Sequence, residues 1–141
     1  MGILTKLKEL FEKKPIIETL RQLEEEFAKI QNKNKYDMIA LIGTGGRLKG
    51  LPLVYAAEDE DSLKILTARL SELLKTIQNL SSGDNVRDIV INYDDSILFF
   101  KPIMTNISFF AIVRDNNDIL ILKQFIYTNE DLLKELFHDR I

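Results

Sequence analysis

Three strand-like runs near the C-terminal end of the chain constrain the fold more than any other feature. They cover residues 86–93, 96–103 and 107–113, and two short turns separate them, DD at 94–95 and TN at 105–106. Parallel neighbours need a crossover connection of about a dozen residues or more, which these gaps cannot supply. We therefore predict that the three strands pair antiparallel.

The same runs predict a sheet that is buried on both faces. In residues 96–103 and 107–113, neighbouring positions of both parities are apolar. A sheet with one face in water would alternate apolar and polar side chains instead. Helices must then cover both faces, and amphipathic helices are predicted at 16–31 and 59–80, with a closing helix that ends near Phe137.

Two more strands are predicted before the second of these helices, at Tyr36–Ile42 and Leu53–Ala57. The predicted order is helix, strand, strand, helix, strand, strand, strand, helix. This is an α+β fold in which a five-stranded antiparallel sheet has helices on both faces. One additional amphipathic helix is predicted within residues 1–14, and residues 15–141 are expected to form a single domain.

A glycine-rich stretch, IGTGGRLKGLP at 42–52, joins the first two strands and holds four of the six glycines. A phosphate-binding P-loop needs a Lys and a Ser or Thr after its last glycine, and a dinucleotide fingerprint needs a glycine where Leu48 stands. A strand follows the stretch, so no helix N-terminus is available to an anion. We predict a long hairpin turn with positive φ at glycines. The alternative is a phosphate site formed by Arg47 and Lys49.

Composition excludes several kinds of site. The 141 residues include no Cys and one His, His138, so neither a thiol nucleophile nor a Cys-ligated zinc is available, and we expect no metal or cofactor. The net charge of −3, with both signs interspersed, argues against nucleic-acid binding. No apolar run approaches the roughly 20 residues of a membrane span. With no signal peptide recognised, a cytoplasmic protein is expected.

The order of elements, with GLPLVYAAED (50–59) leading straight into an amphipathic helix, resembles the Roadblock/dynein light chain (Roadblock/LC7-type) family. GLP matches the turn between the first two strands of that family. VRDIVINYDDSILFFKPI (86–103) matches its central hairpin, and ISFFAIVRDNND (107–118) matches its last strand and the following turn. The resemblance covers residues 16 to about 137. The longer glycine turn and the N-terminal helix depart from the family pattern.

This resemblance implies a non-enzymatic scaffold that pairs with itself or a paralogue and binds, regulates or positions a Ras-like small GTPase. The alternative is a longin-like adaptor that associates with a membrane surface through its N-terminal helix. An apolar face and four lysines in residues 1–14 favour membrane contact, whereas Glu9 and Glu12 oppose it.

The chain shows no sign of its own catalytic site. The acidic pairs Asp59/Asp61 and Asp94/Asp95 lie at a helix start and in a turn, where acids are common for structural reasons. No His or Cys accompanies them, so no nucleophile and base can be assigned. A GTPase-activating role in trans stays open. The arginines available for it are Arg47, Arg69 and Arg114.

The strand at 86–93 is expected at an edge of the sheet, where an apolar strand invites aggregation unless something covers it. We predict that the same strand of a second chain covers it. A two-fold axis near Ile89 or Val90 avoids placing Asp88 or Arg87 opposite its own copy. The predicted dimer interface consists of Val86, Arg87, Asp88, Ile89, Val90 and Ile91.

The helix at 59–80 carries residues that lie off its main apolar stripe. They are either a solvated flank or a surface that packs against the second chain or faces the GTPase. These residues are Ile65, Ala68, Arg69, Glu72 and Thr76.

Overall fold

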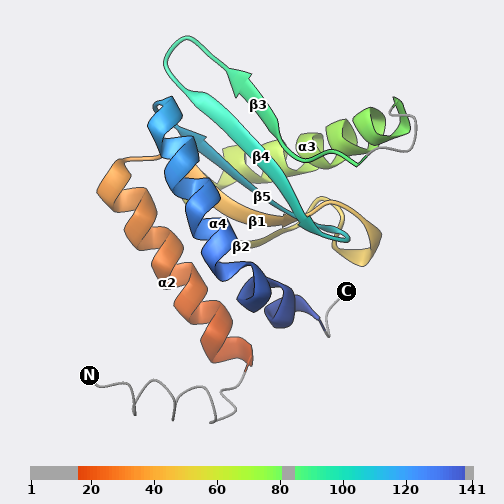
Figure 1. Cartoon of the computed structure of the whole chain (residues 1–141), viewed down its shortest axis with the longest axis horizontal. Helices are drawn as coiled ribbons and strands as arrows, with labels where there is room; N and C mark the ends of the chain where they lie inside the picture. Colours follow the sequence, from red (N-terminus) through yellow and green to blue (C-terminus); the bar gives the residue numbers. More distant parts are fainter. Residues whose placement is uncertain (1–15, 81–84, 139–141) are drawn as a thin grey trace.

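The structure is a computed structural model that describes residues 16–80 and 85–138 (Figure 1). The helix predicted within residues 1–14 lies outside these residues. The division of the chain at residue 15 therefore stays a prediction.

The elements follow the predicted order. The helices are α2 (Ile16–Asn34), α3 (Glu60–Leu80), α4 (Asn116–Phe137) and a short 3₁₀ helix, η1 (Gly46–Leu48). The strands are β1 (Met38–Gly43), β2 (Pro52–Ala57), β3 (Ile89–Asn92), β4 (Ile97–Met104) and β5 (Ile107–Val113). They form one sheet in the order β2-β1-β5-β4-β3, and every neighbouring pair is antiparallel. The predicted fold class is confirmed.

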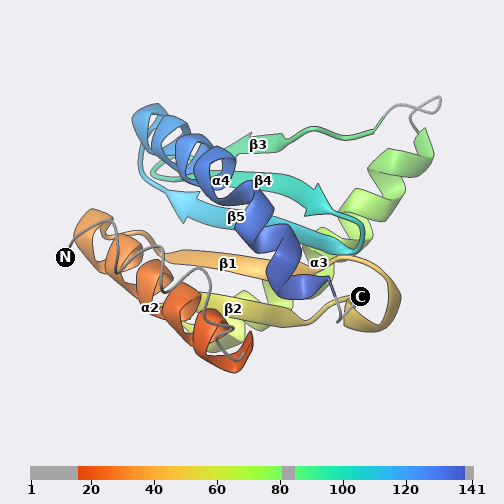
Figure 2. The same cartoon turned by 60° about the horizontal axis from the view of Figure 1, so that its bottom comes forward.

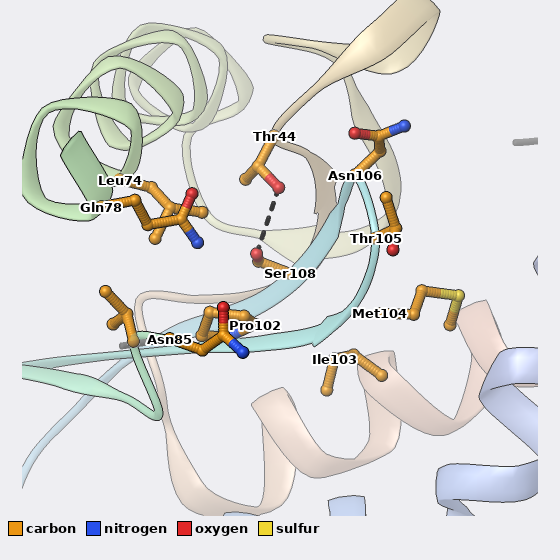
Figure 3. Close-up of a pocket in the computed structure, with 11 residues that line it drawn as sticks. Thr44, Leu74, Gln78, Asn85, Pro102, Ile103, Met104, Thr105, Asn106 and Ser108 are labelled. Atoms are coloured by element: carbon orange, nitrogen blue, oxygen red, sulfur yellow. Dashed lines mark hydrogen bonds between the residues drawn. The ribbon is translucent and has the colours of Figure 1, made fainter. Parts of the chain in front are cut away.

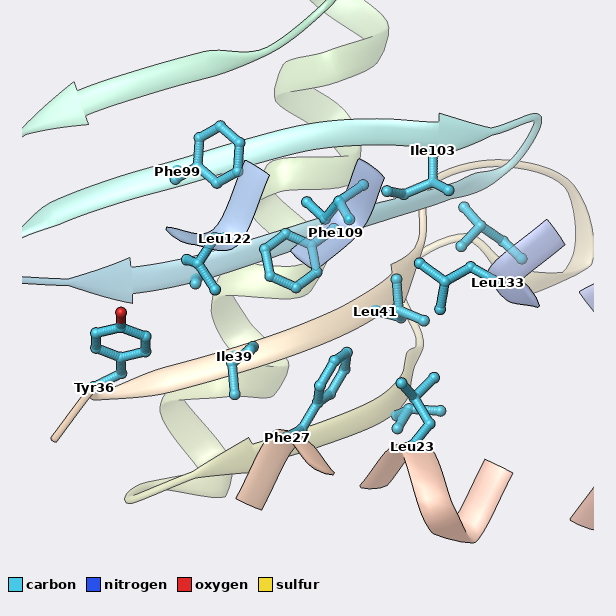
Figure 4. Close-up of a cluster of buried hydrophobic side chains, with 14 of the residues drawn as sticks. Leu23, Phe27, Tyr36, Ile39, Leu41, Phe99, Ile103, Phe109, Leu122 and Leu133 are labelled. Atoms are coloured by element: carbon cyan, nitrogen blue, oxygen red, sulfur yellow. The ribbon is translucent and has the colours of Figure 1, made fainter. Parts of the chain in front are cut away.

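Helices cover both faces of the sheet, as the apolar runs predict. Figures 1 and 2 show α2 and α4 together on one face and α3 on the other. Neighbouring residues of one strand enter different cores: Phe109 packs with α2 and α4, whereas Phe110 packs with α3. In the α2/α4 core (Figure 4), the Phe109 ring centroid lies 6.0 Å from that of Phe27 and 6.2 Å from that of Phe99.

Strand β3 is shorter than predicted. Residues 86–88 were expected to belong to it, but it begins at Ile89. Ile89 pairs with Phe100, so the ladder would next place Arg87 opposite Pro102, which has no N–H to donate. Lys101 Nζ donates to the Arg87 carbonyl instead, at 3.3 Å. The pairing therefore ends at the proline.

Aspartates cap two of the helices. The carboxylate of Asp59 accepts the backbone N–H groups of Asp61 and Ser62, at 3.0 and 3.3 Å, so Asp59 caps α3. A cap at Ser62, which the sequence also allows, does not form. Asp115 and Asp118 form a reciprocal capping box at the start of α4. This cap fixes a helix over a segment rich in β-branched residues that also suit a strand.

Tyr36 is fully buried at one end of the α2/α4 core (Figure 4), and its hydroxyl has no hydrogen-bond partner of good geometry among the described residues. Burial raises the pKa of this hydroxyl, and the nearby carboxylate of Asp118 raises it further. The folded protein therefore holds the proton more tightly than the unfolded chain, in which the tyrosine pKa is about 10. Stability from this group is present below pH 10 and is lost as the pH rises above that value.

We expect Tyr36→Phe to raise the free energy of unfolding at pH 7 by about 1 kcal/mol, since it removes an unpaired buried hydroxyl. Above pH 10 the variant should lose less stability than the wild type. Urea unfolding at neutral and alkaline pH measures both effects. Tyr127→Phe, the same change on an exposed side chain, is the control and should follow the wild type. If the free energy of unfolding of the wild type and that of Tyr36→Phe changed by the same amount up to pH 12, the proposed link between the Tyr36 pKa and stability would be contradicted.

Candidate interaction surfaces

Strand β3 is an edge strand of the sheet, and among the described residues no other strand pairs with its outer side. Tyr93 N donates to Ser96 O at 2.8 Å and closes the β3–β4 hairpin. Bonded and non-bonded pairs alternate along an antiparallel ladder, so the N–H and C=O groups of Ile89 and Ile91 point to β4. Those of Val90 and Asn92 point away from the sheet.

The side chains of β3 also divide between the two faces. Ile89 and Ile91 pair with Phe100 and Leu98, so they lie on the α3 face, where both are half-buried. Val90 lies on the α4 face and is 41% exposed. Two of the predicted interface residues lie outside the strand and have contacts within the chain. Val86 packs against the α3 core, and Asp88 lies 3.8 Å from Lys123 Nζ. The strand edge that remains for pairing is short and apolar.

The residues predicted on the outer side of α3 are all exposed. Ile65, 59% exposed, is the large apolar one. Glu72 pairs with Lys49 of the glycine turn, and this ion pair lowers the pKa of the Glu72 carboxyl. Helix α3 packs on β1 and β2, whereas β3 lies at the other edge of the sheet. The predicted dimer edge at β3 and the outer side of α3 therefore lie over different parts of the sheet.

The glycine-rich stretch is a packed turn. Gly46 and Gly50 have positive φ, 59° and 80°, as predicted. Gly43 closes the base of the turn, because its N–H donates to Leu51 O at 2.8 Å and its carbonyl accepts from Gly50 N at 2.9 Å. With Lys49 paired to Glu72, Arg47 is the cation left for the alternative phosphate site. The structure favours the turn.

Polar residues singled out from the sequence have structural partners. Asp59 caps α3, and hydrogen bonds from Ser62 lower the pKa of its carboxyl. Arg114 donates to Asp37 Oδ1 at 2.8 Å and to Lys35 O at 3.4 Å. Of the three arginines considered for a role in trans, Arg47 and Arg69 are exposed and have no such pairing with a described residue. Over the described ranges, no cluster of three His, Cys, Asp or Glu residues is placed to hold a metal ion. None of the described helices has the length and apolar character that a membrane span requires.

A polar cavity that no sequence pattern indicates lies between the C-terminal part of α3 and the end of the β4–β5 hairpin (Figure 3). Its volume is about 460 Å³. Its residues come from the glycine turn, α3, the segment before β3, and the β4–β5 hairpin. They are Thr44, Leu74, Gln78, Asn85, Val86, Pro102, Ile103, Met104, Thr105, Asn106 and Ser108.

Known structures share this arrangement. No protein-family model matches the chain, and no curated protein matches it either. The Roadblock/LC7 domain from Streptomyces avermitilis aligns with 17% identity and a TM-score of 0.56, over 70% of this chain and 85% of that one. Myxococcus xanthus MglB aligns with 11% identity and a TM-score of 0.67, over 83% and 95% of the two chains. An MglB with a tetrameric arrangement aligns with 13% identity and a TM-score of 0.70, over 92% and 96%.

The fold is therefore that of Roadblock/LC7 domains, as the sequence resemblance implies. The three comparisons cover most of both chains, so the shared architecture is the whole layered sheet. A shared fold does not by itself assign a function, which must be argued from surfaces.

Proposed function

We propose that this protein is a non-enzymatic dimeric scaffold that binds a Ras-like small GTPase and regulates or positions it. The observation that carries the proposal is the outer edge of β3 in a Roadblock fold, with which no other strand of the described ranges pairs. An apolar strand edge is a template for another strand, and charged residues or proline normally blunt it. In β3, Val90 occupies the middle of that edge with its backbone N–H directed outward.

The charges around β3 select one register for a symmetric dimer. A two-fold axis perpendicular to the joined sheet keeps side chains on their own face, so paired positions share parity. An axis at Val90 pairs Val90 with its copy, Ile89 with the partner's Ile91, and Asp88 with the partner's Asn92. An axis at Ile89 places Asp88 opposite the partner's Val90, so a charge meets an apolar residue. An axis at Ile91 places Asp88 opposite the partner's Asp94, so two like charges meet. Apolar residues meet apolar ones, and like charges stay apart, only in the Val90 register.

The outer side of α3 is the surface we assign to the GTPase. Ile65, Ala68 and Arg69 are exposed there, and the Lys49–Glu72 ion pair links the helix to the glycine turn. An exposed apolar residue beside an arginine is a common composition for a binding hot spot. The fold itself uses the other side of the helix, where Thr67 and Ser71 are buried.

Affinity capture from a native lysate with the immobilised full chain tests the function, with mass spectrometry as the readout. We expect a small GTPase among the enriched proteins. Ile65→Asp should lower its recovery at least about ten-fold, because a charge replaces an exposed apolar contact at the proposed hot spot. Thr128→Asp, on the exposed side of α4, is the matched control and should leave recovery unchanged. Capture without any small GTPase, or equal loss with both variants, contradicts the proposal.

A further inference from the structure

The cavity beside α3 has a polar floor in an otherwise apolar face of the sheet. Ser108 is a fully buried polar residue, whereas Phe110 and Ile112 on the same face of β5 are apolar. The hydroxyl of Ser108 lies 3.2 Å from that of Thr44 at the end of β1 (Figure 3). Residues 64 positions apart in the sequence thus form a hydroxyl pair at the bottom of the cavity.

This pair has hydrogen-bonding capacity to spare. Two hydroxyls carry two donors and several lone pairs, and the bond between them uses one donor and one acceptor. Among the described residues, neither hydroxyl has a further side-chain partner. The pair can therefore exchange further hydrogen bonds with an occupant that both donates and accepts.

The rest of the lining defines the chemistry of that occupant. No charged side chain is among the described residues that line the cavity. Its other polar side chains are the amides of Gln78, Asn85 and Asn106 and the hydroxyl of Thr105, whereas Leu74, Val86 and Ile103 provide apolar walls. An unpaired ionic group is costly to remove from water. The lining therefore suits a neutral ring with an amide or lactam edge.

We propose that this cavity is a binding site for a small neutral ring compound that carries an amide or lactam group, such as a pyrimidine base or nicotinamide. The ring lies against the apolar walls, and the amide edge exchanges hydrogen bonds with Thr44 and Ser108. The volume of about 460 Å³ falls within the range of small-molecule pockets, about 300 to 1,000 Å³, and far exceeds the need of a single water. The site does not depend on the proposed dimer or on the GTPase.

A titration followed by ¹⁵N–¹H NMR tests the site on the full chain, with nicotinamide as the probe. We expect saturable shifts of the amide signals of Thr44, Asn106 and Ser108 at ligand concentrations of about 1 to 20 mM, typical of a fragment-sized ligand. Nicotinate has the same ring with a charged group, and toluene has a ring with no polar edge. Both should bind at least about ten-fold more weakly than nicotinamide.

Ser108→Ala should weaken nicotinamide binding about five-fold, the effect of one hydrogen bond. Thr67→Val is the matched control: Thr67 is an equally buried hydroxyl residue on the same side of the sheet, its hydroxyl donates to Leu63 O within α3, and it does not line the cavity. It should leave binding unchanged if the fold is kept, which the dispersion of the spectra reports. No shifts in this range, equal binding of nicotinate or toluene, or an unaffected Ser108→Ala would each overturn the proposal and leave a cavity filled by water only.

Discussion

Val90→Pro is expected to convert the protein from a dimer into a folded monomer. In the Val90 register the two central backbone N–H groups donate to the carbonyls of the same residue in the other chain, and proline removes both donors. Its ring also occupies the space where the second strand would lie. We expect the dimer to dissociate at least about 100-fold more readily, from two lost hydrogen bonds and the added steric clash. Light scattering coupled to size-exclusion chromatography measures the change.

The position is chosen so that the monomer itself survives. The N–H of Val90 points away from β4, so proline costs β3 no hydrogen bond to β4, and proline is tolerated at such edge positions. Ile89→Pro would instead remove a ladder bond to Phe100 and confuse unfolding with dissociation. Val90→Thr keeps both the N–H and the branched side chain, so it should remain dimeric. An unchanged dimer mass for a folded Val90→Pro variant would contradict the scaffold proposal, and so would a wild type that is monomeric at high concentration.

The features of the fold that depend on local sequence patterns could be predicted from the sequence. Two-residue turns and apolar residues of both parities predicted β4, β5 and a sheet covered on both faces, and the structure has β5 at the predicted residues. Local pattern could not show where β3 begins, because its ladder ends opposite Pro102 and that pairing depends on the register with β4. The apolar residues at 86 and 89–91 led to the prediction of a strand that begins three residues too early.

The cavity was missed for a similar reason. Its floor joins Thr44 and Ser108, which only the β1–β5 pairing brings together, since Ser108 lies opposite Ile42. The one local signal was a serine within the apolar run ISFFAIV. A single small polar residue in a strand also occurs for packing reasons, so the sequence alone did not distinguish the two cases. In three dimensions Ser108 is fully buried and lies beside a second hydroxyl, and this is the observation from which the proposed site is argued.

The glycine-rich turn gives the second large expected effect, because its glycines serve two different purposes. Gly50 has φ of 80° with open space around its Cα, so it is a conformational requirement. At Gly43 the requirement is steric: an added Cβ would overlap the backbone carbonyl of Leu48. The same carbonyl accepts from Leu51 N at 3.0 Å, so it cannot move without breaking the turn.

Gly43→Ala is therefore expected to lower the free energy of unfolding by about 3 kcal/mol, the range of an overpacked core site, or to prevent folding. Its carbonyl also accepts the Ser71 hydroxyl of α3 at 2.9 Å, so a displaced turn would loosen the helix as well. Gly50→Ala, the same methyl added where only φ is strained, should cost about 1 kcal/mol. Urea unfolding of both variants compares the two. Equal costs would show that the turn yields at Leu48 and that backbone conformation, not close packing, determines the glycine at position 43.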